Sequence, residues 1–100
     1  MIAKKTNDQL EITFGENITA AVVEELTDKI KSILEENDDY SHVIANFSNV
    51  EYIDSTGITL VIGMYRSVAD MKKQFSIIGT KYEIKNLFNI IQLDKIFKIA

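Results

Sequence analysis

The chain has 100 residues, of which 46% are hydrophobic, and a single domain with a real core is expected because a chain of this length buries roughly 60–70% of its surface on folding. The sequence contains no cysteine, which excludes disulfides and cysteine-ligated metals. The net charge of −4, with no basic cluster beyond two lysine pairs, disfavours nucleic-acid binding.

Nothing in the sequence indicates a membrane segment or a second domain. No apolar stretch approaches the ~20 residues that a membrane-spanning helix needs. The first residues, Met1–Lys5, lack the apolar segment of a signal peptide, so we expect a cytoplasmic protein that is not inserted in a membrane. Proline is absent and the four glycines are scattered, so residues 1–100 are predicted to form one domain without a linker.

The first half of the chain predicts two strands, a helix and a third strand. Ile2–Phe14 is typical of two short strands on either side of Asn7 and Asp8. Thr19 to about Asn37 is predicted to be a helix, because its apolar residues recur every three or four positions. Val43–Phe47 is a nearly continuous apolar run, which is typical of a strand covered on both faces.

A second helix and a fourth strand follow. Gly57–Lys72 contains several β-branched residues and two glycines, but its length and apolar spacing favour a helix. Gly63 within it is expected to mark a close approach to a neighbouring element. Phe75–Ile78 is a second apolar strand.

The last part of the chain predicts a third helix and an edge strand. Thr80 and Glu83 have the spacing of a capping box, which indicates that a helix starts there. Lys95–Ile99 alternates charged and apolar residues and is predicted to be a final edge strand. The order β-β-α-β-α-β-α-β predicts a single α/β domain, with a mixed β-sheet that is parallel at its centre and helices packed against it.

The most informative segment is Tyr52–Ile58, where a carboxylate, two hydroxyls and a glycine join two apolar segments. This composition indicates a tight turn into a helix, which Asp54 or Ser55 can cap and in which Gly57 keeps the turn unhindered. Ser55 would lie on the first helical turn, beside free backbone N–H groups that suit an anion. It could then accept a phosphoryl group, although from the residues alone a plain helix cap is the simpler interpretation.

Catalytic chemistry is poorly supported. A nucleophilic serine needs a histidine or lysine base, and the only histidine, His42, is interpreted as an ordinary residue at the start of a strand. The glycines form neither a phosphate-binding loop nor a dinucleotide-binding pattern. We therefore expect no enzyme activity, no cofactor and no metal.

The segment Asp54-Ser55-Thr56-Gly57-Ile58 resembles the Asp-Ser-Ser/Thr-Gly-Leu signature of the anti-sigma factor antagonists, small bacterial members of the STAS domain family. Leu93–Phe97 resembles the leucine-aspartate-lysine-isoleucine-phenylalanine segment near the end of these proteins. The resemblance runs from about Gln9 to Ile99 and includes the order of strands and helices. After the motif glycine, Ile58-Thr59 replaces the common leucine-glycine.

The resemblance implies a phosphorylation switch. The unphosphorylated protein would bind an anti-sigma factor that is also a serine kinase, and this binding would release a sigma factor. Phosphorylation of Ser55, or less favourably of Thr56, would end the binding, and a separate serine phosphatase would restore it. Asp54, Ser55, Thr56 and Gly57 are the expected partner-binding residues. The alternative is a non-phosphorylated STAS scaffold subunit of a larger signalling or transport assembly, in which Ser55 is only a cap.

Overall fold

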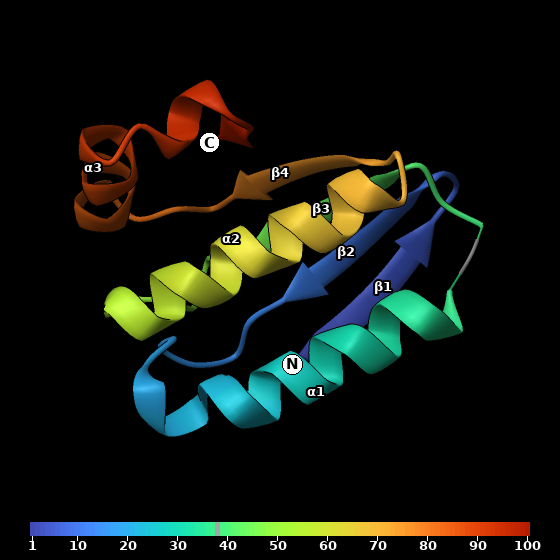
Figure 1. Cartoon of the computed structure of the whole chain (residues 1–100), viewed down its shortest axis with the longest axis horizontal. Helices are drawn as coiled ribbons and strands as arrows, with labels where there is room; N and C mark the ends of the chain where they lie inside the picture. The colour runs from blue at the N-terminus through green and yellow to red at the C-terminus, as the bar shows by residue number, and fades with distance from the viewer. Residues whose placement is uncertain (38) are drawn as a thin grey trace.

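The computed structural model describes residues 1–37 and 39–100, and these form a five-stranded sheet with helices (Figure 1). The elements, in chain order, are β1 (Ile2–Thr6), β2 (Gln9–Thr13), α1 (Ala20–Glu36), β3 (His42–Asn46), α2 (Ser55–Asp70), β4 (Gln74–Ile78), α3 (Tyr82–Ile90), the short 3-10 helix η1 (Leu93–Lys95) and β5 (Lys98–Ile99). This order confirms the predicted α/β fold.

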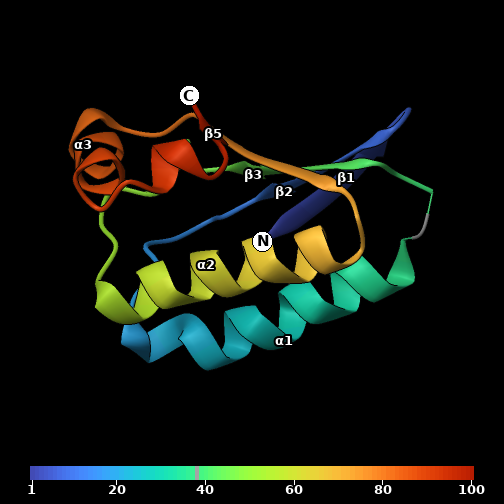
Figure 2. The ribbon, with the colours of Figure 1, turned by 45° about the horizontal axis from the view of Figure 1, so that its top comes forward.

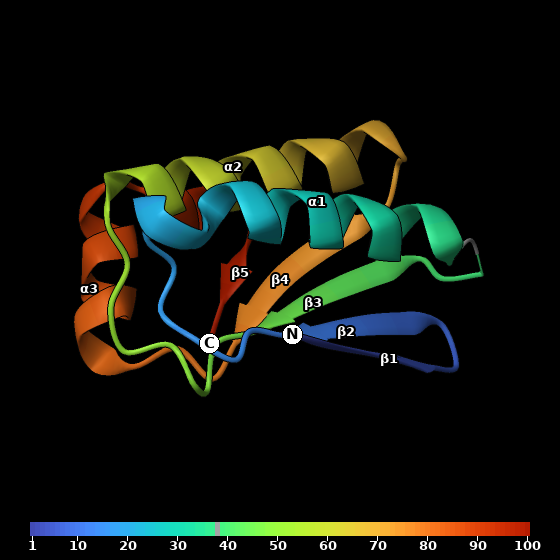
Figure 3. The ribbon, with the colours of Figure 1, turned by 90° about the horizontal axis from the view of Figure 1, so that it is seen from below.

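The strands lie in the sheet in the same order as in the sequence. β1 is antiparallel to β2, and the other three pairings are parallel. Right-handed crossovers between neighbouring parallel strands place successive helices on the same face. Figure 3 shows α1 and α2 side by side on one face, while α3 lies beyond the end of the sheet where β3 and β4 finish (Figure 2).

The opposite face of the sheet carries none of the helices that the structure describes, so the prediction that the third strand is covered on both faces was wrong. Val43 and Ala45 are fully buried beneath the helices. His42, Ile44 and Asn46 alternate with them and are only half-buried. The apolar run Val43–Phe47 therefore led to a wrong prediction that both faces of this strand are covered, because Ile44 is an apolar residue on the open face.

The core lies between the sheet and the two long helices. Its strand residues point toward α1 and α2 in a period of two, as a half-covered sheet requires. Those from the sheet are Leu10, Ile12, Val43, Ala45, Phe75 and Ile77, and those from the helices are Leu26, Ile30, Leu34, Leu60, Val61, Met64 and Val68.

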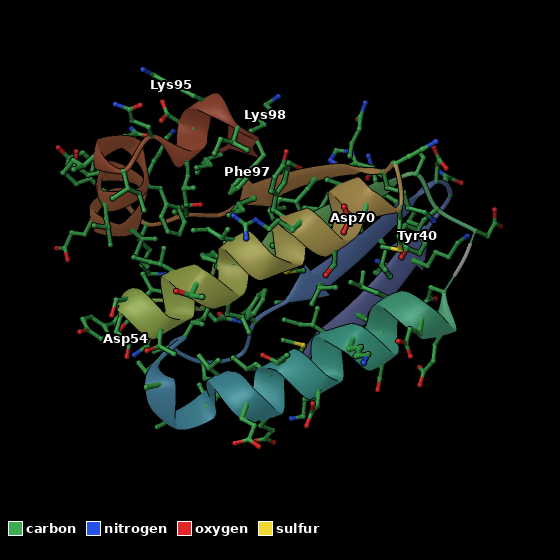
Figure 4. All side chains as sticks on the ribbon, viewed as in Figure 1. Tyr40, Asp54, Asp70, Lys95, Phe97 and Lys98 are labelled. Carbon is green, nitrogen blue, oxygen red and sulfur yellow. The ribbon has the colours of Figure 1, made fainter. Side chains whose placement is uncertain are left out.

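Aromatic contacts attach the C-terminal third of the chain to this core. The ring of Phe47 lies edge-on to Phe14 at 5.2 Å and to Phe88 of α3 at 6.1 Å, both measured between centroids. Phe97, which is labelled in Figure 4, contacts Phe75 at 4.9 Å and Tyr65 of α2 at 5.3 Å. Such pairs contribute about 0.5–1.5 kcal/mol beyond the burial of their area.

Two predictions for the C-terminal region were wrong. The expected capping box does not form, because Lys81 rather than Thr80 is the N-cap of α3 and no side chain caps this helix. The Thr80 backbone N–H instead donates to the Ala100 carbonyl at 3.0 Å. The expected strand over 95–99 shrinks to Lys98–Ile99, because η1 brings both Leu93 and Phe97 into the core before the strand begins.

Gly57 and Gly63 both lie in α2, and Gly63 differs from the expectation. Gly57 is buried within the first turn of the helix, in agreement with the predicted helix start. A Cβ atom at Gly57 would lie 2.1 Å from the carbonyl oxygen of Ile18 and 2.7 Å from Cγ1 of Ile53. Gly63, expected at a close approach, has no atom within 4 Å of its Cβ position.

The two glycines therefore predict opposite effects of the same substitution. Gly57→Ala should lower the free energy of unfolding by about 1–3 kcal/mol, because backbone must move to admit the methyl group. Gly63→Ala should raise it by roughly 0.5–1 kcal/mol, because alanine favours the helix and meets nothing. Urea denaturation of the two variants measures both values, and equal effects would contradict this assignment.

Candidate functional site

The loop before α1 is joined to the loop before α2. The Asn17 side-chain oxygen accepts hydrogen bonds from the backbone N–H groups of Glu51 and Tyr52, at 2.8 and 3.0 Å. The backbone of Ile18 forms a parallel bridge with Ile53, and both of these side chains are buried. The segment that leads into Ser55 is therefore held firmly against a second loop from another part of the chain.

Asp54 completes this connection and caps two helices at once. One carboxylate oxygen, Oδ1, accepts the backbone N–H of Gly57 in α2 at 2.8 Å. The other, Oδ2, accepts the backbone N–H of Ala20 in α1 at 2.9 Å. Asp54 lies where the starts of these helices come together (Figure 4). The two hydrogen bonds, that from Ala20 first, hold the pKa of the Asp54 carboxyl below its usual value.

Ser55 is the first residue of α2, and its side chain is exposed. In the part of the chain that the structure describes, its hydroxyl group makes no hydrogen bond, while its carbonyl oxygen accepts from Thr59 Oγ1 at 3.1 Å. The structure thus confirms that Asp54 is the cap and that Ser55 lies on the first turn. This hydroxyl can be reached from solvent without displacing a side-chain contact.

One expectation about the surroundings of Ser55 needs correction. The backbone N–H groups at the start of α2 were expected to be free for an anion. The Asp54 carboxylate accepts one of them, the N–H of Gly57. A phosphate on Ser55 would therefore lie beside the negative charge of Asp54.

The remaining motif residues differ in their exposure. Thr56 is exposed on α2, whereas Gly57 is buried against the chain's own Ile18, so its contact with a partner stays a prediction. Tyr52, which was not among the expected partner-binding residues, is 58% exposed three residues before Ser55. Exposed aromatic residues are enriched in protein interfaces, and a tyrosine next to the motif was the signal that was missed.

Among the residues that the structure describes, no histidine lies beside Ser55. His42 lies at the opposite end of β3 from this site, where its Nε2 is 2.8 Å from Ser76 Oγ. Within residues 1–37 and 39–100, no three acidic or histidine side chains are grouped in a way that could hold a metal ion. None of the helices described is long and apolar enough to cross a membrane.

The double cap predicts a pH dependence of stability. Because folding lowers the pKa of Asp54, its contribution is fully present above the unfolded value of about 3.9 and is lost as the pH falls through the lower folded value. Asp54→Asn can still cap α2 but has only one oxygen acceptor, so it should be less stable than wild type at neutral pH. Urea denaturation from pH 7 to pH 2 should show this difference shrinking with acid, and a difference that stays constant would contradict it.

Comparison with known proteins places this site in a family. The STAS domain model matches residues 1–100. The chain is 29% identical over 93 residues to the anti-sigma-B factor antagonist of Staphylococcus epidermidis, covering 93% of this chain and 84% of the relative.

Two solved structures share the fold at low sequence identity. An anti-sigma factor antagonist from Mycobacterium paratuberculosis superposes with a TM-score of 0.83 at 16% identity, covering 99% of this chain and 82% of the other. The phosphorylated form of the Bacillus cell fate determinant SpoIIAA superposes with a TM-score of 0.71 at 22% identity. The match covers 99% of this chain and 89% of the other. The fold, the motif at the start of α2 and the full-length match agree: the chain belongs to the STAS domain family.

Proposed function

We propose that this protein is an anti-sigma factor antagonist that phosphorylation of Ser55 switches off. The observation that carries the proposal is the exposed, unbonded hydroxyl of Ser55 at the first turn of α2, behind an Asp54 carboxylate that fixes the helix start. The similarity to a staphylococcal anti-sigma-B factor antagonist supports the same role. Such a protein acts by binding and needs no catalytic residue of its own.

The binding surface is built around the start of α2. Ser55 and Thr56 are exposed there, and Tyr52 adds an exposed aromatic residue on the preceding loop. Asp54 holds this surface in place through its bonds to both helices. The unphosphorylated protein would present this surface to an anti-sigma factor with serine kinase activity, which would then release its sigma factor.

Phosphorylation would act through charge at this surface. A phosphoserine adds about −1.5 to −2 charges and three acceptor oxygens. Asp54 accepts the Gly57 N–H at the helix start, so a phosphate on Ser55 would lie next to a second negative charge on the surface that faces the partner. A loss of about 3 kcal/mol, on the order of 100-fold in affinity, would be enough to release the partner. A serine phosphatase would reverse the step.

The fold has no reason to change on phosphorylation. Ser55 is exposed and makes no side-chain contact that the phosphate would break. The phosphorylated form of SpoIIAA has the same fold as this chain, so the STAS fold accommodates a phosphorylated state in that protein. The expected consequence is a change of partner and not a change of structure.

Phosphosite mapping tests the acceptor. The purified chain is incubated with ATP and a lysate of its native host, and mass spectrometry should find phosphate on Ser55. The Ser55→Ala variant should remain unmodified, while Thr56→Ala, the matched control one residue away, should be modified like wild type. Phosphate on Thr56 would move the acceptor. An unmodified wild-type chain in a lysate that phosphorylates another substrate would refute the switch.

Binding measurements test the consequence. Ser55→Ala should bind the host's anti-sigma factor in the presence of ATP without being released, while Ser55→Asp should bind on the order of 100-fold more weakly, because it carries a charge at the contact. Both variants should have the circular dichroism spectrum and melting temperature of wild type within a few degrees. Equal affinities of these two variants, measured by calorimetry, would rule the mechanism out.

A further inference from the structure

An apolar groove runs along the outer surface between α1 and α2 and has a volume of about 590 Å³. The two helices lie side by side and point in the same direction (Figure 1). The buried side chains of Ile30 and Leu34 from α1, and of Leu60 and Met64 from α2, line it. Its lining extends from Thr56 to Met71, which corresponds to about 22 Å of helix.

Gly63 opens the middle of this groove. No atom lies within 4 Å of a Cβ atom placed on Gly63, so the space over it is empty. Thr59 and Ser67, about one turn away on either side, also line the groove and have short side chains. A glycine in a helix interior costs about 1 kcal/mol relative to alanine, and here no packing requirement of the fold explains it.

A positively charged and a negatively charged side chain lie at one end of the groove. Lys31 and Glu35 both line it from the C-terminal half of α1. They are one turn apart, so their Cβ atoms are about 5–6 Å from each other. In the part of the chain that the structure describes, neither side chain forms an ion pair or a hydrogen bond. Both charges are available to a ligand.

We propose that this groove binds one molecule of a zwitterionic single-chain amphiphile, of the lysophospholipid type. The hydrocarbon chain would lie on the aliphatic floor toward Thr56, the phosphate would contact Lys31, and the ammonium group would contact Glu35. The volume lies in the range of about 300–1,000 Å³ that small-ligand sites occupy. A purely anionic amphiphile would satisfy Lys31 but face the carboxylate of Glu35, and a cationic one would face the ammonium of Lys31.

This proposal stands apart from the phosphorylation of Ser55. The groove is formed by helix surfaces, and its lining includes Thr56 but not Ser55. A failure of the groove to bind lipid would leave the switch unaffected, and an absence of phosphorylation would leave the groove intact.

A titration of the isotope-labelled protein with dodecylphosphocholine, below its critical micelle concentration, tests the site. Saturable binding should shift the amide signals of Thr59, Gly63 and Ser67 in NMR spectra. Dodecanoate, dodecyltrimethylammonium and dodecyl maltoside have the same chain with other head groups. Each should bind roughly 2–5-fold more weakly, which is the scale of one exposed ion pair. Absence of saturable binding, as expected if the groove serves a partner's helix, would overturn the proposal, and so would tighter binding of dodecanoate.

Variants locate the binding. Gly63→Leu fills the empty centre of the groove and should weaken dodecylphosphocholine binding at least about tenfold, because one buried leucine-sized volume carries more than 1.4 kcal/mol. Arg66→Leu, on the same helix but outside the lining, is the matched control and should bind like wild type. Lys31→Gln and Glu35→Gln should each weaken binding by about 2–5-fold. Undiminished binding by Gly63→Leu would place the ligand elsewhere and overturn the assignment.

Discussion

The site depends on the carboxylate of Asp54, on which the first turns of α1 and α2 converge. It accepts one backbone N–H from each helix, and both of these N–H groups would otherwise lack a partner within their own helix. α1 and α2 together cover one face of the sheet, and these two hydrogen bonds fix the starting points of the helices relative to each other. Gly57 serves the same junction, since only a residue without a Cβ atom lets α2 begin against the backbone of Ile18.

The junction places the fixed cap Asp54 next to the exposed Ser55, the proposed phosphorylation site. Asp54 is committed to the fold, and Ser55 beside it is left free. This division explains how a single phosphoryl group could alter binding while the fold persists, because its charge is added where the protein makes no contact of its own. The groove between the same helices begins at Thr56. The placement of the two helix starts therefore also shapes the end of the groove nearest Thr56.

Much of the fold and of the site could be predicted from local patterns. The alternation in β2 and the period of α1 report burial on one face, and both elements form as expected. The motif from Asp54 to Gly57 was correctly interpreted as a helix start with Asp54 as a possible cap. The errors concern Thr80, Gly63, the cover of the third strand and the strand over 95–99, where the pattern within a few residues was compatible with several structures.

The sequence by itself determined the order of the elements, the family motif and the position of Ser55 on a helix start, because these follow from contacts between residues close in the chain. Only the tertiary structure decided that Asp54 also caps α1, that Gly57 meets Ile18 and that Gly63 faces empty space. Each of these depends on how segments more than 30 residues apart, or whole helices, come to lie side by side. The relative position of such segments in space is set by packing of the core, which no local pattern of residues encodes.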